Sequence, residues 1–173
     1  GTRAHNTLCV KGADQSIISG AFNWSHKAEA RLDGLTEQPF TAALSHDGYH
    51  GRFGVRHERR ITREGDAIIL TDRLAGASAP LDSELTLQLG EACSAVAEPD
   101  GTIAVSVNGQ VWAHIRFPQA GQVKIACGQD GHDGGWLSPA FGIRRPAPRL
   151  SWTGQVGAGD AITRIALLAP SNG

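Results

Sequence analysis

The sequence lacks methionine altogether, and no apolar run in it approaches the roughly 20 residues needed to span a membrane. Its formal net charge of −1 also lacks the basic excess that bulk nucleic-acid binding requires. We therefore expect no membrane partner and no nucleic-acid partner. Since a natural chain starts with Met, we expect Gly1 to be a processed or cut end; the first residues show no charged-then-apolar signal pattern.

Cysteine is scarce as well. Cys9, Cys93 and Cys127 are odd in number and show no C-x-x-C spacing, so they indicate neither a zinc knuckle nor a disulfide framework. We interpret them as buried free thiols. The common catalytic signatures are missing too: there is no G-x-S-x-G turn and no glycine-rich phosphate loop.

Glycine, in contrast, is abundant. The chain has 22 glycines among 173 residues, against a typical share of about 7%. Without a collagen repeat or a low-complexity block, this excess indicates many turns and therefore many short strands. The length is that of one domain.

The strongest pattern is an alternation of apolar and polar residues with period two. It places Ile103, Val105 and Val107 on one face of a strand, and the hairpin dipeptide Asn108-Gly109 follows at once. Residues 94–117 are therefore predicted to form a meander of three strands. Similar runs along the chain predict an all-β fold, a two-sheet antiparallel β-sandwich of about a dozen strands with little helix.

Residues 46–50 gather two histidines, an acid and the only tyrosine around a glycine: His46, Asp47, Gly48, Tyr49 and His50. We predict a loop here, and two interpretations stay open. In one, the loop faces a substrate and His46 or Tyr49 donates hydrogen bonds to it. In the other, it is a turn whose Tyr49 ring packs on the sheet.

Arginines are concentrated in the segment that follows, at positions 52, 56, 59, 60 and 63. Guanidinium groups pair bidentately with carboxylate and sulfate-like groups, so an acidic polysaccharide is a natural partner for such a surface. The alternative is a solvated strand face, on which Glu58 and Glu64 offset the positive charge.

Several short motifs resemble those of heparinase II/III-like proteins. Ala4 is followed by His5-Asn6-Thr7, an apolar strand, a Gly turn and Asp14-Gln15-Ser16. Then come residues 46–49 (HDGY), the pair Arg59-Arg60 and residues 71–74 (TDRL), in the order of that family. The resemblance is clear over residues 1 to about 90, and the His-Asn-Thr strand is its most specific part.

This resemblance implies a parent protein in which an (α/α) toroid precedes a C-terminal β-sandwich. Residues 1–173 are then expected to be that single sandwich domain, a C-terminal fragment without its helical partner. The family implies β-elimination on uronic-acid polysaccharides such as glycosaminoglycans, and periplasmic or secreted localisation. No residue here is a confident catalytic residue, although His46 and Tyr49 are weak candidates. The residues expected to contact an acidic polysaccharide are Arg3, His46, Tyr49, Arg59 and Arg60.

The resemblance also implies a metal. In several members the His of the His-Asn-Thr strand ligates zinc, which makes His5 a metal ligand by analogy. The other two ligands, a His and an Asp, come from strands that precede this segment. We therefore expect no cofactor in the isolated chain, and zinc only in the full-length protein.

Two hypotheses follow. In the first, the chain is the sandwich domain of a polysaccharide lyase, supports the catalytic toroid and lines the substrate cleft, and is inactive alone. In the second, it is a non-enzymatic carbohydrate-binding or structural sandwich. The tryptophans fit both, since Trp rings suit sugar stacking as well as cores; they are Trp24, Trp112, Trp136 and Trp152.

Overall fold

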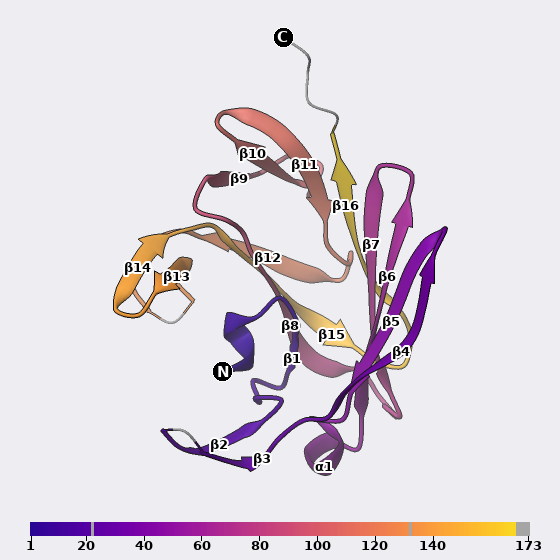
Figure 1. The fold of residues 1–173 in the computed structure, drawn as a ribbon. Helices are drawn as coiled ribbons and strands as arrows, with labels where there is room; N and C mark the ends of the chain where they lie inside the picture. The colour runs from indigo at the N-terminus through magenta and orange to yellow at the C-terminus, as the bar shows by residue number, and fades with distance from the viewer. Residues whose placement is uncertain (22, 132, 169–173) are drawn as a thin grey trace.

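The computed structural model describes residues 1–21, 23–131 and 133–168, and within them strands make up nearly all of the regular structure (Figure 1). The larger sheet has eight antiparallel strands, in the spatial order β4 (Ala30–Glu37), β5 (Phe40–His46), β6 (Arg56–Glu64), β7 (Ala67–Ala75), β16 (Ala161–Leu167), β11 (Gln110–Arg116), β10 (Ile103–Val107) and β9 (Cys93–Ala97). The smaller sheet has four, in the order β1 (Leu8–Val10), β8 (Leu81–Gln88), β15 (Arg149–Val156) and β12 (Gly121–Ala126).

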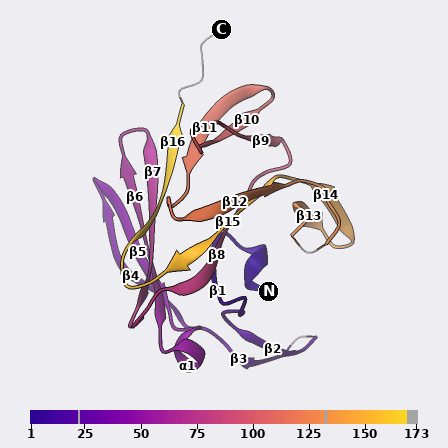
Figure 2. The ribbon, with the colours of Figure 1, turned by 180° about the vertical axis from the view of Figure 1, so that it is seen from behind.

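Two hairpins stand apart from these sheets. One joins β2 (Ile17–Gly20) to β3 (Asn23–His26), and the other joins β13 (Trp136–Ala140) to β14 (Ile143–Pro146). Figure 2 shows from behind how both hairpins project from the body of the molecule. Helix is limited to the 3-10 turn η1 (Thr2–Ala4) and the four-residue α1 (His50–Phe53) in the described residues.

The hydrophobic core lies between the two sheets. Leu85, Leu150 and Trp152 of the smaller sheet share one buried cluster with residues of the larger sheet such as Leu70 and Ile115. The Trp152 Nε1–H donates to the Pro118 carbonyl (3.0 Å), so even its polar atom is satisfied. The predicted two-sheet antiparallel β-sandwich is confirmed, and Trp152 belongs to the core.

The predicted meander of residues 94–117 is confirmed as β9, β10 and β11 at one end of the larger sheet. Its Asn108-Gly109 turn has positive φ at both residues (52° and 80°), the conformation for which this dipeptide is selected. The described residues hold sixteen strands rather than about a dozen. Alternation finds β10 and β11, where buried apolar residues recur two positions apart (Ile103 and Val105, Ala113 and Ile115), whereas the residues of β2, β3 and β4 are all exposed.

Two local predictions need correction. Residues 46–50 are not one loop, because His46 ends β5 and His50 begins α1, with a tight turn between them. Of the three thiols interpreted as buried, only Cys9 is; Cys93 is half-buried and Cys127 is exposed, and all three are free. Within the described part of the chain, no helix has the length and apolar character that crossing a membrane takes.

Candidate functional site

Strands β6 and β7 carry a dense group of charged residues, and strand geometry divides these between two faces. Successive side chains of a strand point to opposite sides of the sheet. His57 and Arg59 therefore lie on the inner face, toward the smaller sheet, with Asp72 of β7. Arg56, Glu58, Arg60 and Arg73 occupy the outer face, toward solvent. Each face holds one candidate site.

The inner face holds a chain of four hydrogen-bonded side chains, which we call the inner cluster: His46, His57, Asp72 and Arg59. His46 Nε2 lies 3.0 Å from His57 Nδ1, and His57 Nε2 lies 2.6 Å from Asp72 Oδ1. Arg59 binds the same carboxylate through Nε (2.7 Å) and Nη2 (3.0 Å). Asp72 is 1% exposed, so the whole chain ends on a buried carboxylate.

The backbone determines the tautomer of both imidazoles. The Gly48 N–H donates to His46 Nδ1 (3.2 Å), so this nitrogen is an acceptor and the proton of a neutral His46 sits on Nε2. His46 Nε2–H then donates to His57 Nδ1, and His57 Nε2–H donates to Asp72. All four ring nitrogens are engaged, with the donors running in one direction toward the carboxylate.

The electrostatics agree with this arrangement of protons. Burial, together with the neighbouring His57 and Arg59, lowers the pKa of His46 to about 4, so its ring is neutral near pH 7. Burial alone would raise the pKa of Asp72, but hydrogen bonds from His57 and Arg59 and the Arg59 charge outweigh it and hold that pKa below its usual value. Asp72 and Arg59 thus form a charged pair in the inner cluster, beside the neutral ring of His46.

Arg59 also connects the inner cluster to the His-Asn-Thr segment. Its Nη1 donates to the Asn6 carbonyl (2.6 Å), while the Asn6 side chain accepts the Gln88 N–H of β8 (2.7 Å). The next residue, Thr7, accepts a hydrogen bond from the Gln15 side chain (3.1 Å). Residues far apart in the sequence therefore hold one short backbone segment in place between the two sheets.

Gly48 is required by this packing. A Cβ atom on it would lie 2.5 Å from the Gln15 carbonyl oxygen and 3.0 Å from the Ala28 side chain, closer than real Cβ contacts allow. The turn after β5 therefore packs directly on the Asp14-Gln15-Ser16 segment. The motifs that suggested a family by their order in the sequence meet in space at the inner cluster.

A pocket of about 360 Å³, the inner pocket, opens beside the inner cluster. His46, His57 and Arg59 form one wall, and Ala30, Leu32 and Leu44 supply an apolar wall from β4 and β5. Its size is at the lower end of small-molecule sites, roughly 300–1,000 Å³. Because every imidazole nitrogen is already bonded, the histidines offer shape and polarity to this pocket rather than a free acid or base.

The sequence-predicted site residues are thus brought together only in part. His46 and Arg59 meet in the inner cluster, whereas Arg60 lies on the outer face of the same sheet. Tyr49 is fully buried: its hydroxyl donates to the Leu8 carbonyl (2.8 Å), and burial raises the pKa of Tyr49. Arg3 lies at the smaller sheet, where its Nε pairs with Glu84 (3.0 Å).

His5 lies exposed at the end of η1, one residue before the anchored Asn6. Among the described residues, no group of three or more His, Cys, Asp or Glu side chains could hold a metal ion. The described residues therefore do not fit a zinc ion by themselves.

Sequence reasoning missed His57 and Asp72 as members of a site. The available signal was alternation with period two. In Arg56-His57-Glu58-Arg59 every second residue faces the same side of a strand, and Asp72 also falls at a position that faces the core. Recognising it needed the register that pairs Arg59 with Asp72 and His57 with Leu74. That register is a tertiary property, which alternation within one strand does not give.

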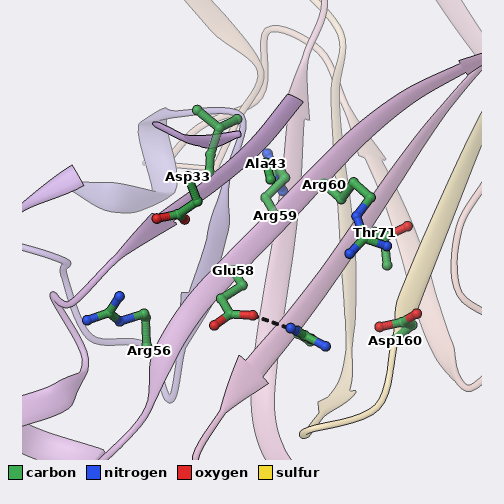
Figure 3. A pocket seen from close by; sticks show the side chains of 10 residues that line it. Asp33, Ala43, Arg56, Glu58, Arg59, Arg60, Thr71 and Asp160 are labelled. Carbon is green, nitrogen blue, oxygen red and sulfur yellow. Dashed lines mark hydrogen bonds and ion pairs between the residues drawn. The ribbon is translucent and has the colours of Figure 1, made fainter. Parts of the chain in front are cut away.

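The outer face has a hollow of about 250 Å³, the outer hollow, which Figure 3 shows with its charged lining. Arg56, Glu58 and Arg60 follow one another along β6. Arg73 of β7 pairs with Glu58 through Nε (2.6 Å). The other charged residues of the lining are Asp33 of β4, Asp160 just before β16, and Arg59.

Known proteins are similar to this chain over nearly its whole length. A family model described as "Heparinase II/III-like, C-terminal" matches residues 1–166. A solved structure described as a heparinase III with methylated lysines is similar over 98% of this chain, with a TM-score of 0.59 and 15% sequence identity. The match spans only 24% of that heparinase III chain, and at this identity the likeness shows the fold alone. No curated protein matches the sequence.

Proposed function

We propose, since this chain belongs to the heparinase II/III-like family as a C-terminal domain, that it is the β-sandwich part of a polysaccharide lyase. The reaction would be β-elimination on a uronic-acid polysaccharide. The observation that carries the proposal is the match over residues 1–166 together with the meeting of its sequence motifs at the inner cluster. The chain spans about a quarter of the heparinase III it resembles, so the catalytic residues would come from a helical domain outside this sequence.

The first role of this chain in such an enzyme would be to support the helical domain. Exposed apolar side chains are available for that contact: Ile18 and Trp24 on the β2–β3 hairpin, and Leu32 and Leu35 on β4. An isolated two-stranded hairpin is marginally stable in water, and β2 and β3 pair only with each other. We propose that the helical domain covers this hairpin and the β4 edge.

The second role would be to line the substrate cleft with the inner pocket. In β-elimination a base removes the proton next to the uronate carboxylate, and an acid protonates the leaving oxygen. His46 and His57 have no free nitrogen for either step while the inner cluster is intact. We therefore propose that the inner cluster shapes the cleft wall and that the base and acid reside in the helical domain.

The substrate contacts expected from the sequence remain a proposal, and the structure supports them unequally. Arg60 and Arg3 are exposed, so their guanidinium groups are accessible to a polysaccharide. Arg59 already donates two hydrogen bonds to the Asp72 carboxylate, through Nε and Nη2, and Tyr49 has no exposed surface. His46 is partly exposed and lines the inner pocket.

Zinc is proposed only for the full-length protein. His5 would be one ligand, held in position by the Arg59 contact to the Asn6 carbonyl, and the other two, a His and an Asp, would come from strands that precede this segment. A structural zinc ion adds to folding free energy. His5→Ala in the longer protein is therefore expected to lower metal content, read by elemental analysis, and thermal stability together.

The decisive experiment compares two proteins: the 173-residue chain, and a longer chain that carries it behind a helical domain. Both are incubated with heparan, chondroitin and alginate, and unsaturated uronate products are followed by their ultraviolet absorbance. We expect product from the longer chain only. Product from the 173-residue chain would contradict the proposal that the catalytic residues lie in the helical domain. A longer chain without activity on any uronate polymer would favour a non-enzymatic sandwich.

A further inference from the structure

We propose that the outer hollow is a second ligand site, separate from the inner pocket, and that it binds a single sugar acid: a hydroxylated ring that bears one carboxylate. The juxtaposition of arginine, aspartate and threonine side chains on the outer face of β6 and β7 carries this inference (Figure 3). It opens on the opposite side of the sheet from the inner pocket, although Leu44 and Arg59 line both.

The register of the sheet explains why there is a hollow at all. Arg60 stands between Ala43 of β5 and Thr71 of β7, which are its direct cross-strand partners. Both neighbours are small, so a depression of about 250 Å³ remains beside the long arginine. That volume is slightly below the roughly 300 Å³ where small-molecule sites begin, which suits one sugar ring rather than an oligomer.

The arginines of the outer hollow have donors to spare. Among the described residues, Arg56 and Arg60 make no side-chain hydrogen bond or ion pair. Arg73 uses only its Nε, toward Glu58. A guanidinium has five N–H donors in a fork that matches a carboxylate, so Arg60 and Arg56 can each take a bidentate acceptor.

The acids in the same lining narrow the ligand class. Asp33 and Asp160 oppose the arginine charges, so a bare anion gains little net attraction in the outer hollow. Carboxylates are acceptors, however, and sugar hydroxyls are donors. A ligand with one carboxylate for Arg60 and several hydroxyls for Asp160, Asp33 and Thr71 satisfies both kinds of group. A neutral sugar has no carboxylate for Arg60, and sulfate has no hydroxyl groups for the aspartates.

The test is a nuclear magnetic resonance titration of the 173-residue chain with sodium glucuronate, with glucose and sodium sulfate as matched probes. We expect a saturable response to glucuronate, with a Kd of about 1 mM for a ligand of this size in an open site. The shifts should map to β6 and β7. Glucose and sulfate should bind at least about tenfold more weakly, the range for losing one hydrogen-bonded charged group.

Variants then locate the site. Arg60→Gln should weaken glucuronate binding about tenfold or more. Glu58→Gln should strengthen it severalfold, because it removes a negative charge and frees the Arg73 Nε. Arg164→Gln is the control: Arg164 is half-exposed on the same face of the larger sheet, and it lies outside the outer hollow, where it pairs with Glu64 (3.5 Å). It should leave the Kd within about twofold, since exposed charges at a distance are screened.

Several outcomes would overturn the proposal. Equal weakening by Arg60→Gln and Arg164→Gln would mean general attraction to a basic surface. Equal affinity for sulfate would mean an unselective anion site, and shifts confined to the inner cluster would place the ligand on the other face. The denaturation midpoint of Arg60→Gln shows whether binding is lost because the variant is unfolded. If it is, Arg56→Gln serves as the second variant. Since the test measures binding to this chain alone, it does not depend on whether the longer protein is a lyase.

Discussion

Neighbouring residues on β6 and β7 have opposite environments. Asp72 and Arg59 point inward and form a bidentate pair in which the carboxylate is 1% exposed. Arg73 and Glu58 point outward and form a pair of similar length, 2.6 Å, with side chains 46% and 30% exposed. The inner pair is extended by two histidines and a backbone carbonyl, whereas the outer pair stands among unpaired charges. An arginine–carboxylate pair is therefore part of the buried structure on one face and exposed to solvent on the other.

The largest expected effect tests whether the inner pair is structural. Asp72→Ala leaves Arg59 and His57 buried without their acceptor, and removal of one partner of a buried ion pair costs about 3–5 kcal/mol. Urea denaturation of the 173-residue chain measures the loss. The matched outer variant, Glu58→Ala, should cost about 1 kcal/mol or less because its pair is solvated. Equal losses would remove the distinction between the faces.

The dependence of stability on pH gives the next largest effect. His46 has a pKa of about 4 when folded, against about 6.5 in an unfolded chain. Between these values the unfolded state binds a proton that the folded state does not, so the free energy of unfolding should fall as pH drops from 6.5 to 4 and this contribution should then level off. The partly exposed ring justifies a loss of only about 2 kcal/mol.

His46→Gln is the control for that prediction. A glutamine amide still donates toward His57 but does not titrate. Its unfolding free energy should therefore be less dependent on pH across the same window, measured as denaturation midpoints at pH 4, 5, 6 and 7. Parallel curves for the wild type and His46→Gln would show that another group is responsible. Asp72, with its lowered pKa, adds a loss only as pH falls below its unfolded value of about 3.9.

A smaller effect concerns the connection between the turn after β5 and the smaller sheet. Tyr49→Phe keeps the buried ring but removes the hydroxyl that donates to the Leu8 carbonyl, leaving that acceptor unsatisfied. We expect a loss of about 1–2 kcal/mol in the free energy of unfolding. A thermal denaturation midpoint that does not change would indicate that the carbonyl finds another donor. It would also argue against the conclusion that buried hydrogen bonds on the inner face stabilise the fold.

The smallest effect is predicted for the outer hollow. Arg60→Ala removes a side chain that makes no contact on which the fold depends, so its unfolding free energy should stay within about 0.5 kcal/mol of the wild type. Calorimetry of the two proteins at one pH measures the difference. A loss above 2 kcal/mol would show that Arg60 has a structural partner, and the two faces would then be alike.

The sequence predicted the fold better than it predicted the site. Alternation at Ile103, Val105 and Val107 and the Asn108-Gly109 turn identify three strands, because both signals are local. The sequence could not show that Arg59 binds Asp72 and the Asn6 carbonyl, since these partners come from β7 and from the segment before β1. Tyr49 was left between two interpretations, a substrate contact and a packed ring, and the structure places its ring in the core. His57 and Asp72 became visible only through strand register.

The first strand of the larger sheet has one further consequence. β4 is an edge, and all eight of its residues are exposed, so it offers backbone N–H and C=O groups to any other extended chain. The ladder between β4 and β5 is interrupted between Leu32 and Gly34, where the intervening Asp33 bulges out and adds a charge. Bulges and charges at an edge discourage addition of a further strand. Asp33 therefore disfavours edge-to-edge pairing of β4 with another copy of the protein while this edge is uncovered.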